Sequence, residues 1–454
     1  MLAIGLDIGT TSVCGILYDT NAQRLIKAIT EPNDTFIDTN ESWKKIQDAE
    51  KLISKLCDIY SRLQLEANGN ASSVGITGQM HGIVYLNEFG KPVSPLAIWQ
   101  DGRGDQIYKD GKTYAEYLSE QTGYPLATGY GSVTYYYDSV NNLVPEDAVT
   151  FCTIHDLAAM ALSSSQTPLV HTSDAASLGL FDIKNSQFDF DAITKVGLNP
   201  AMFPKVADGF CCIGKTDTDV PVSIAIGDNQ ASFIGSVADM QNSLLINVGT
   251  GSQISCAVNT VPNNTSLDCR PLVKSNYIMA GSSLCGGRAY AMLEKFLREA
   301  ATLISGTEIK SAYPAIDNLM NNYQQSDSPV IVDTAFCGTR TEPNRRGSIS
   351  NISIDNFTVV DFCDGFMGGI ATELYTMYEQ IKPLLNHEPT IMIGSGNGLR
   401  FNKPLCKKFE QLFGLKLIIP EHKEEAAFGA MLYSLVASGE CDDISNAQKL
   451  IKYI

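Results

Sequence analysis

The sequence lacks the features that mark a membrane protein, a secreted protein or a structural metal site. It has no run of about 18 or more apolar residues, so we expect no helix that spans a bilayer. The N-terminus has no basic leading segment, and Asp7 and Thr10 interrupt its apolar stretch, so we expect no secretory signal. None of the 12 cysteines lie in C-x-x-C spacing and the 5 histidines are scattered, which argues against a zinc site.

Positive charge is also scarce. The 454 residues include 33 Lys and Arg against 50 Asp and Glu, a net charge of −17, and an acidic surface repels nucleic-acid phosphates. Local N–H donors and a metal ion can still neutralise a bound nucleotide. The length and the 44% hydrophobic content suit two or three globular domains. The cysteine usage is typical of reduced thiols, so we expect a cytoplasmic protein.

The chain does contain one short pattern twice. Each copy is an apolar strand, a Gly-Thr-x-Ser turn and a second apolar strand, and 249 minus 9 gives an offset of 240 residues. The offset pairs Gly9 with Gly249, Thr10 with Thr250, Ser12 with Ser252 and Asp7 with Asn247. Such a turn presents backbone N–H groups and hydroxyls in one direction, which suits phosphate oxygens. A single copy would fit an ordinary hairpin equally well.

Periodicity predicts strands and helices in both halves. The expected helices are residues 41–63, 288–304, 366–385 and 426–437, with another opening at Asp228. The expected strands include 13–18, 74–77, 83–86, 221–226, 254–258, 390–393 and 415–419. No low-complexity linker separates the halves, so we expect two closely packed lobes, residues 1–240 and 241–454, with ligand at a cleft between them.

Two carboxylates follow strands at positions where chemistry is expected. Asp7 stands beside the first turn, where a carboxylate can hold Mg²⁺; the alternative is an Asp that caps its own turn. Asp228 opens a helix after a strand, where it could accept a proton from a substrate hydroxyl that attacks phosphorus. The alternative for Asp228 is helix N-capping, which needs the same residue type.

Two polar segments suit a polyol. Gln79, Met80 and His81 follow a predicted strand, where the polar side chains could bind hydroxyls and the methionine could pack on a carbon face. Trp99 to Arg103 combines an aromatic ring with an amide, a carboxylate and a guanidinium. In the alternative reading of that second segment, Asp101 and Arg103 pair with each other in a surface loop.

Two further segments carry weaker signals. Residues 394–398 form a glycine-rich turn after a strand, and Asn402 follows it; glycines there would let a flat ring or a ribose approach the backbone. An ordinary strand-to-helix turn is the alternative. Residues 338–347 form a basic cluster, and Arg345 and Arg346 could be solvated charges, so we leave them out of the candidate site.

Together these motifs resemble, in order and along essentially the whole chain, those of the FGGY family of carbohydrate kinases. The resemblance implies an α/β fold of two actin-like ATPase (ribonuclease H-like) domains with a cleft between them. Asp228 would then be the general base, and the sugar contacts would be Gln79, Met80, His81, Trp99 and Asp101. ATP would be held by Thr10, Thr11, Ser12, Gly249, Thr250, Ser252, Gly394, Ser395, Gly396, Asn397 and Asn402, with Mg²⁺ at Asp7. We expect a monomer or homodimer.

Four segments, residues 98–103, 127–131, 153–156 and 173–177, resemble the family members that phosphorylate sedoheptulose. A few substitutions beside the sugar can change which ketose fits, so a xylulose- or ribulose-type pentulose kinase is the alternative. A non-metabolic actin-like ATPase would explain the paired turns but not the polar segments. A catalytically silent sugar sensor is disfavoured, because every motif position carries a chemically competent residue.

Overall fold

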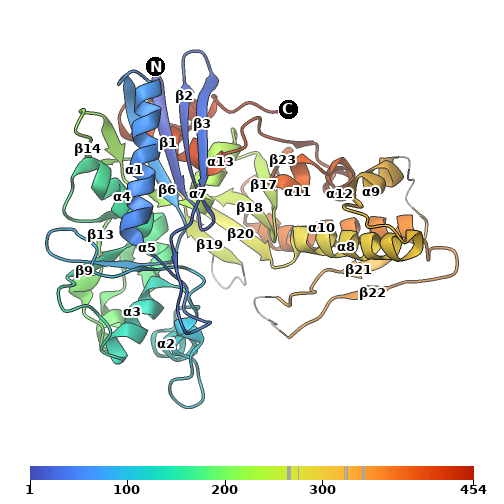
Figure 1. Ribbon diagram of the computed structural model, residues 1–454, viewed down its shortest axis with the longest axis horizontal. Helices are drawn as coiled ribbons and strands as arrows, with labels where there is room; N and C mark the ends of the chain where they lie inside the picture. The colour runs from blue at the N-terminus through green and yellow to red at the C-terminus, as the bar shows by residue number, and fades with distance from the viewer. Residues whose placement is uncertain (263–266, 275, 322, 324–325, 340–341, 343) are drawn as a thin grey trace. The chain divides into compact units, whose positions relative to one another are not determined.

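The computed structural model describes residues 1–262, 267–274, 276–321, 323, 326–339, 342 and 344–454, which form two compact units (Figure 1). The first unit comprises Met1–Ala238, Arg270–Tyr277 and His422–Ile451, and the second comprises Asp239–Cys269, Ile278–Glu421 and Lys452–Ile454. The chain thus returns to the first unit near its end, which the single expected boundary after residue 240 does not include. None of the helices in the described ranges combines the length and apolar character that a bilayer crossing requires.

The first unit is built on a seven-stranded sheet of order β14-β15-β6-β1-β2-β3, with β16 also paired to β6. Strands β1, β2 and β3 form antiparallel pairs, whereas β6 runs parallel to β1. The sheet strands are β1 (Leu2–Ile8), β2 (Ser12–Asp19), β3 (Arg24–Pro32), β6 (Ala71–Gly78), β14 (Cys212–Lys215), β15 (Pro221–Ser223) and β16 (Ile226–Gly227). The shorter strands are β4 (Phe36–Ile37), β5 (Ile46–Gln47), β7 (Val84–Leu86), β8 (Leu96–Ala97), β9 (Thr150–Cys152), β10 (Leu169–His171), β11 (Phe181–Asp182), β12 (Gln187–Phe188) and β13 (Lys205–Ala207).

Helices cover both faces of this sheet. The helices of this unit are α1 (Ala49–Glu66), α2 (Tyr114–Thr122), α3 (Gly131–Val140), α4 (Ile154–Ser163), α5 (Thr172–Leu178), α6 (Phe190–Lys195), α7 (Asp228–Ser236), α13 (Glu425–Ala437) and α14 (Ile444–Gln448), with 3₁₀ turns at Gly102–Asp105 and Pro200–Met202. Gly15 faces Ile59 and Leu63 of α1. Gly15 of β2 pairs with Leu6 of β1, whereas the preceding residue, Gly5, faces α13. Because successive strand residues point to opposite faces, α1 and α13 lie on opposite faces of the sheet.

The return of the chain to the first unit is explained by two glycines. Gly5 of β1 and Gly75 of β6 are paired in register, and a Cβ on either would lie 1.9 or 1.8 Å from a backbone oxygen of α13, that of Ala427 or Ala430. Without these side chains, α13 packs directly on the sheet backbone. The apolar helix expected at residues 426–437 is observed, and its burial against this sheet places residues 422–451 in the first unit.

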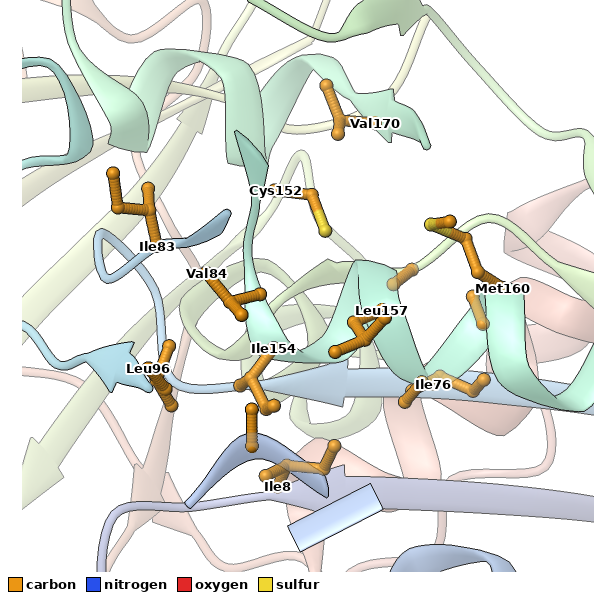
Figure 2. Close-up of a cluster of buried hydrophobic side chains, with 14 of the residues drawn as sticks. Ile8, Ile76, Ile83, Val84, Leu96, Cys152, Ile154, Leu157, Met160 and Val170 are labelled. Atoms are coloured by element: carbon orange, nitrogen blue, oxygen red, sulfur yellow. The ribbon is translucent and has the colours of Figure 1, made fainter. Parts of the chain in front are cut away.

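The hydrophobic core of the first unit lies between the sheet and the α1 and α4 layer, and continues under the short strands. Figure 2 shows part of it, where α4 packs above β1 and β6. The labelled side chains are Ile8, Ile76, Ile83, Val84, Leu96, Cys152, Ile154, Leu157, Met160 and Val170. This core fixes the ends of β1 and β6, from which two of the predicted site segments emerge.

The second unit repeats the same sheet plan in a sheet of order β19-β20-β18-β17-β23-β24. Strands β17 and β18 form an antiparallel hairpin, and β23 runs parallel to β17, as β6 does to β1. The strands are β17 (Ser243–Val248), β18 (Ser252–Val258), β19 (Asp268–Pro271), β20 (Tyr277–Ser283), β21 (Ile331–Asp333), β22 (Ser348–Ser350), β23 (Ile391–Ser395) and β24 (Leu417–Ile418). The end of β19 and the first residue of β20 belong to the segment Arg270–Tyr277, which is grouped with the first unit. The helices are α8 (Gly286–Ser305), α9 (Tyr313–Asn321), α10 (Val359–Ile381), α11 (Asn397–Arg400) and α12 (Lys403–Phe413), with a 3₁₀ turn at Lys382–Leu384.

Two expected helices begin at other residues. The helix expected from residue 41 starts at Ala49, because Ile46 and Gln47 join a small sheet and the Asp48 carboxylate caps the helix by accepting from Lys51 N–H at 3.0 Å. The helix expected at residues 366–385 already begins at Val359, capped by the Thr358 hydroxyl. The strand expected at residues 221–226 is split into β15 and β16.

Candidate functional site

The two predicted turns occupy equivalent places in the two units. Strands β1 and β17 end at residues 8 and 248, and β2 and β18 begin at residues 12 and 252. Structurally equivalent residues of the two turns therefore differ by 240 in residue number, as the sequence pattern predicts. The parallel neighbour also matches. In register, Asp7 lies opposite Thr77 of β6, and Asn247 lies opposite Ser395 of β23. The segments after β6 and β23, predicted for sugar and adenosine, therefore follow corresponding strands.

The first turn is closed by its own backbone. Gly9 N–H donates to the Ser12 carbonyl at 2.9 Å, and Ile8 pairs with Val13 in the hairpin. Thr11 is exposed and Ser12 is half-buried. The tip of the turn thus presents backbone and hydroxyl groups at the surface of its unit, as phosphate binding requires.

The Thr10 hydroxyl joins this turn to both predicted sugar segments. It donates to Gln79 Oε1 at 3.3 Å and accepts from Trp99 Nε1 at 2.9 Å, and Gln79 Nε2 donates to Gln47 Oε1 at 2.8 Å. The Thr10 side chain is therefore already engaged, which leaves its backbone N–H as the group for phosphate. The Trp99 side chain is 44% exposed, so part of its ring surface can receive a ligand.

Asp7 and Asp228 are buried carboxylates, and the charge of Asp228 acts on Asp7. Burial, with the charges of Asp228 and Glu424, raises the pKa of Asp7 to about 8. Burial also raises the pKa of Asp228, against the opposing influence of His155 and Arg270. A cation would relieve this repulsion, and carboxylate oxygens are the donors that Mg²⁺ prefers. The residues thus fit a magnesium ion held through Asp7.

Asp228 is the first residue of α7 but does not cap it. The N-cap is Gly227, which makes no side-chain cap hydrogen bond, and Asn229 Nδ2 donates to Asp228 Oδ1 at 3.3 Å. The capping alternative considered for Asp228 is therefore not what the structure shows. At the start of the helix its carboxylate sits at the positive end of the helix dipole.

Helix α5 ties the Asp228 segment to the predicted sugar segment. The Ser173 hydroxyl accepts from Gly227 N–H at 3.1 Å, and the Ser177 hydroxyl accepts from His81 N–H at 3.2 Å. Met80 also contacts the first of these segments, because a Cβ on Gly227 would lie 2.5 Å from Met80 Cε. The candidate base and the candidate sugar contacts are thus held by one element.

The His81 ring is oriented by its neighbours. Its Nδ1 lies 2.8 Å from the Ser177 carbonyl; since a carbonyl accepts only, Nδ1 carries the proton and Nε2 is the acceptor of the neutral ring. The ring stacks on Tyr130 with centroids 4.6 Å apart. His81 also has a φ of +73°, a strained value for a residue with a Cβ, and such strain concentrates at functional sites.

A second buried group of titratable residues lies behind Asp228. His155 Nε2 is 3.0 Å from Asp174 Oδ1, and neither side chain is exposed. Burial and the charge of Asp228 raise the pKa of Asp174 well above its ordinary value, while burial lowers the pKa of His155. Asp156 is used by α4 itself, where its carboxylate accepts from the Thr153 hydroxyl at 2.7 Å. We expect this group to set the electrostatic environment of Asp228.

Asp101 lies inside the unit rather than at its surface. Its side chain has no exposed area, and it accepts from Arg103 Nε at 2.7 Å and from Lys45 N–H at 3.0 Å. The same guanidinium donates to Asp138 at 2.7 Å. Asp101 and Arg103 thus pair with each other, as the alternative predicts, but the pair is buried and Arg103 also binds Asp138. A sugar contact by Asp101 stays a prediction that these bonds do not favour.

The second turn is bound to the start of α8. Gly249 N–H donates to the Gly251 carbonyl at 2.9 Å, and the N–H groups of Gly287 and Arg288 donate to the Gly249 and Thr250 carbonyls, each at 3.0 Å. Gly249 and Thr250 are exposed, whereas Ser252 is buried. The position of the second turn therefore depends on α8, and the sequence pattern does not reveal this dependence.

The predicted adenosine segment packs against that turn's strand. Ser395 accepts from Asn247 Nδ2 at 2.8 Å. Gly396 has a φ of +80°, and a Cβ on it would lie 2.6 Å from the Val248 carbonyl. A glycine is required here by protein packing, whatever a nucleotide needs. Asn397 begins α11, and the Asn402 side chain caps α12, its Oδ1 accepting from Leu405 N–H at 2.9 Å.

The basic cluster is only partly described. Arg340, Thr341 and Pro343 lie outside the described residues, and Arg345 pairs with Asp333 at 2.7 Å. A groove of about 530 Å³ in the second unit is lined by residues that include Asp333, Thr334 and Arg345. None of the predicted nucleotide residues line it.

The site residues missed at the sequence level are Tyr130, His155, Ser173, Asp174 and Ser177. All lie in the segments that we compared with the FGGY family, but without recognisable roles. The sequence shows them only as residues in or next to helices α3, α4 and α5, and the folded chain is needed to show which of them contact His81 and Gly227.

Known proteins resemble this chain in sequence and in fold. Residues 2–245 match the N-terminal domain of the FGGY family of carbohydrate kinases. The chain is 25% identical to a sedoheptulokinase of Mus musculus, over 96% of this chain and 97% of the relative. It is similar in fold to a xylulose kinase of Lactobacillus acidophilus (TM-score 0.84, 19% identity, 100% and 92% of the chains). It is likewise similar to a Plasmodium falciparum glycerol kinase solved with ADP (TM-score 0.82, 16% identity, 99% and 92%).

The fold is therefore the two-domain actin-like ATPase fold expected from the sequence. The family match covers more than half of the chain. The chain belongs to the FGGY family of carbohydrate kinases and is an ATP-dependent phosphotransferase that acts on an alcohol group of a sugar.

Proposed function

We propose that the protein transfers the γ-phosphoryl group of ATP to the C7 hydroxyl of sedoheptulose, with Asp228 as general base. The observation that carries the proposal is the double attachment of α5, through Ser173 to Gly227 and through Ser177 to His81. A base and a sugar-binding ring held by the same helix keep a fixed separation, which is what in-line attack by one hydroxyl requires.

In the proposed reaction the sugar oxygen attacks the γ-phosphorus while the bond from phosphorus to the β-bridging oxygen breaks. The hydroxyl proton passes to Asp228, and the raised pKa of this carboxylate makes it a stronger base. His81 Nε2 would accept from a sugar hydroxyl, and Met80 and Trp99 would pack on the carbon skeleton. Mg²⁺, when bound through Asp7, supplies charge neutralisation at the phosphates.

The two turns would hold the phosphates through their backbone N–H groups and the Thr11, Ser12, Thr250 and Ser252 side chains. Gly394 to Asn397 would line the adenosine. Both assignments are supported by the equivalent strand plan of the two units.

The choice of sedoheptulose is supported by the four sequence segments and by the Mus musculus relative. The measurement that tests it is Mg²⁺-dependent ADP release with sedoheptulose, D-xylulose, D-ribulose, L-ribulose and glycerol. We expect kcat/KM to favour sedoheptulose by roughly tenfold or more, the scale on which a few contacts discriminate between similar substrates. Preference for a pentulose would keep the kinase and reject the heptulose, and an absence of stimulation by any sugar would favour a non-metabolic ATPase.

Ser177→Ala should raise KM for the sugar by roughly 5- to 30-fold, because loss of the hydroxyl leaves His81 N–H without its acceptor at a cost of about 1–2 kcal/mol. We expect kcat and KM for ATP to change by less than about threefold. Steady-state kinetics with each substrate varied in turn measures this split.

The matched control is Ser163→Ala, since that half-buried hydroxyl bonds to the Ala159 carbonyl of its own helix at 2.7 Å. It should leave all three constants near wild type. Equal rises in both KM values for Ser177→Ala would indicate a general loss of folding instead of a loosened His81.

A further inference from the structure

Two cysteines of the second unit lie next to each other in space. Cys285 immediately precedes α8, and Cys337 lies in the turn after β21; their Sγ atoms are 3.6 Å apart. Cys285 is buried, at 2% exposure, whereas Cys337 is half-buried. Both are free thiols, so a partly solvent-exposed sulfur lies next to a buried one.

The two thiols have opposite electrostatic environments. Arg288 Nη1 lies 3.5 Å from Cys337 Sγ, and this contact lowers the pKa of Cys337. Burial raises the pKa of Cys285. Since the thiolate is the reactive form, Cys337 is the sulfur that an oxidant meets first and Cys285 is the partner that resolves the product.

This pair adjoins the second turn. The N–H groups of Gly287 and Arg288, two and three residues after Cys285, hold the Gly249 and Thr250 carbonyls at 3.0 Å. A Cβ on Gly286 would lie 2.5 Å from Ser252 Cβ. The start of α8 is therefore in close contact with the turn, so a displacement of one would move the other.

We propose that Cys285 and Cys337 form a redox-sensitive dithiol that a hydroperoxide converts to a disulfide, and that the disulfide weakens nucleotide binding at the Gly249–Ser252 turn. The bond itself is independent of the proposed function, whereas its effect on ATP rests on the assignment of this turn to phosphate.

The chemistry takes place in two balanced steps. The Cys337 thiolate attacks one oxygen of hydrogen peroxide; an S–O bond forms, the O–O bond breaks, and the departing hydroxide takes a proton to become water. The Cys285 sulfur then attacks Cys337 sulfur; the S–S bond forms, the S–O bond breaks, and the leaving hydroxide takes the thiol proton as a second water. The two thiols lose two electrons, which the peroxide gains.

The disulfide would draw the sulfurs from 3.6 Å to about 2.05 Å. That movement of about 1.5 Å shifts the residue before α8 and removes the thiolate that Arg288 contacts. A misplacement of about 1 Å can lower a reaction rate by about two orders of magnitude. We expect a shift of this size at the phosphate contacts to raise KM for ATP by about fivefold to a hundredfold, and a dithiol reductant to restore KM.

The test is titration of the full-length protein with hydrogen peroxide, followed by peptide mapping without reduction and by kinetics with ATP varied. The expected result is a Cys285–Cys337 cross-linked peptide that appears in step with the rise in KM and disappears with dithiothreitol. Cys337→Ser and Cys285→Ser should each keep KM for ATP after peroxide, and Cys285→Ser should leave a sulfenic acid at Cys337 that a dimedone probe labels.

Cys211→Ser is the matched control, because Cys211 and Cys212 are adjacent, half-buried thiols in the first unit; it should respond to peroxide as the wild type does. A cross-link confined to Cys211 and Cys212, or no cross-link at Cys285, would overturn the site. A Cys285–Cys337 cross-link with unchanged KM for ATP would overturn its effect on the nucleotide. The mass measurement needs no sugar, so it stands apart from the test of the proposed function.

Discussion

Asp228→Asn is expected to lower kcat by roughly two to four orders of magnitude, the span usual for a lost general base. The amide keeps the size of the side chain but cannot take the proton of the attacking hydroxyl. KM for ATP should stay within about twofold, because the nucleotide contacts are unchanged. The measurement is steady-state ADP release at saturating sugar, with ATP varied.

The same variant should be no less stable than the wild type. Burial raises the pKa of Asp228 above its ordinary value of 3.8, so the folded protein disfavours the ionised carboxylate and loses stability as pH rises through that raised pKa. Removal of the charge abolishes this loss, so at neutral pH the melting temperature should stay equal or increase. A fall in kcat without a fall in melting temperature separates a catalytic role from a structural one.

Asp48→Asn is the control for Asp228→Asn. Asp48 also stands at a helix N-terminus, but unlike Asp228 its carboxylate caps the helix by accepting from Lys51 N–H. Its kinetics should stay within about twofold of wild type, since asparagine caps nearly as well. Wild-type turnover in Asp228→Asn, or an equal loss in both variants, would remove Asp228 from the role of base.

The parts that could be predicted from the sequence depend on local patterns. The Gly-Thr-x-Ser turns can be recognised from the sequence because a hairpin is formed by residues that are close in the chain. Each turn is closed by its own residues, so the two turns have the same strand boundaries at an offset of 240 residues. The position of Asp228 at a strand-to-helix junction was likewise local. The sequence could not show that Asp228 does not cap the helix, because the choice between Gly227 and Asp228 as N-cap depends on backbone geometry.

The parts that could not be predicted depend on pairs distant in sequence. The sequence suggests Asp101 as a sugar ligand, but its partner Arg103 also binds Asp138, 37 residues from Asp101, and no spacing rule connects the two carboxylates. Ser177 lies 96 residues from His81, and Ser173 lies 54 residues from Gly227, and each pair meets only after α5 has packed. Buried polar networks of this kind are specified by packing, so a linear pattern indicates the residue types and not their partners.

The glycines of α13 and α7 show how closely stability and catalysis are joined in the first unit. A Cβ on Gly429 of α13 would lie 1.8 Å from the Ala231 carbonyl oxygen of α7, and a Cβ on Gly235 of α7 would lie 2.1 Å from the Glu425 carbonyl oxygen of α13. The two helices thus cross with their backbones in contact. Since α7 begins at Asp228, any separation of the helices moves the proposed base.

Gly429→Ala should therefore destabilise the protein by about 3 kcal/mol, the upper range for overpacking, because the obstacle is backbone that cannot rotate away. For a domain of this size we expect a fall in melting temperature of about 6–12 °C, with a roughly 10- to 100-fold fall in kcat from displacement of Asp228. Gly368→Ala is the matched control: this glycine also lies inside a helix, but a Cβ there meets no atom within 4 Å. Helix propensity favours alanine by about 1 kcal/mol, so the control should be as stable as the wild type or more so. If both variants were equally stable and active, direct contact between α7 and α13 would not be what positions Asp228.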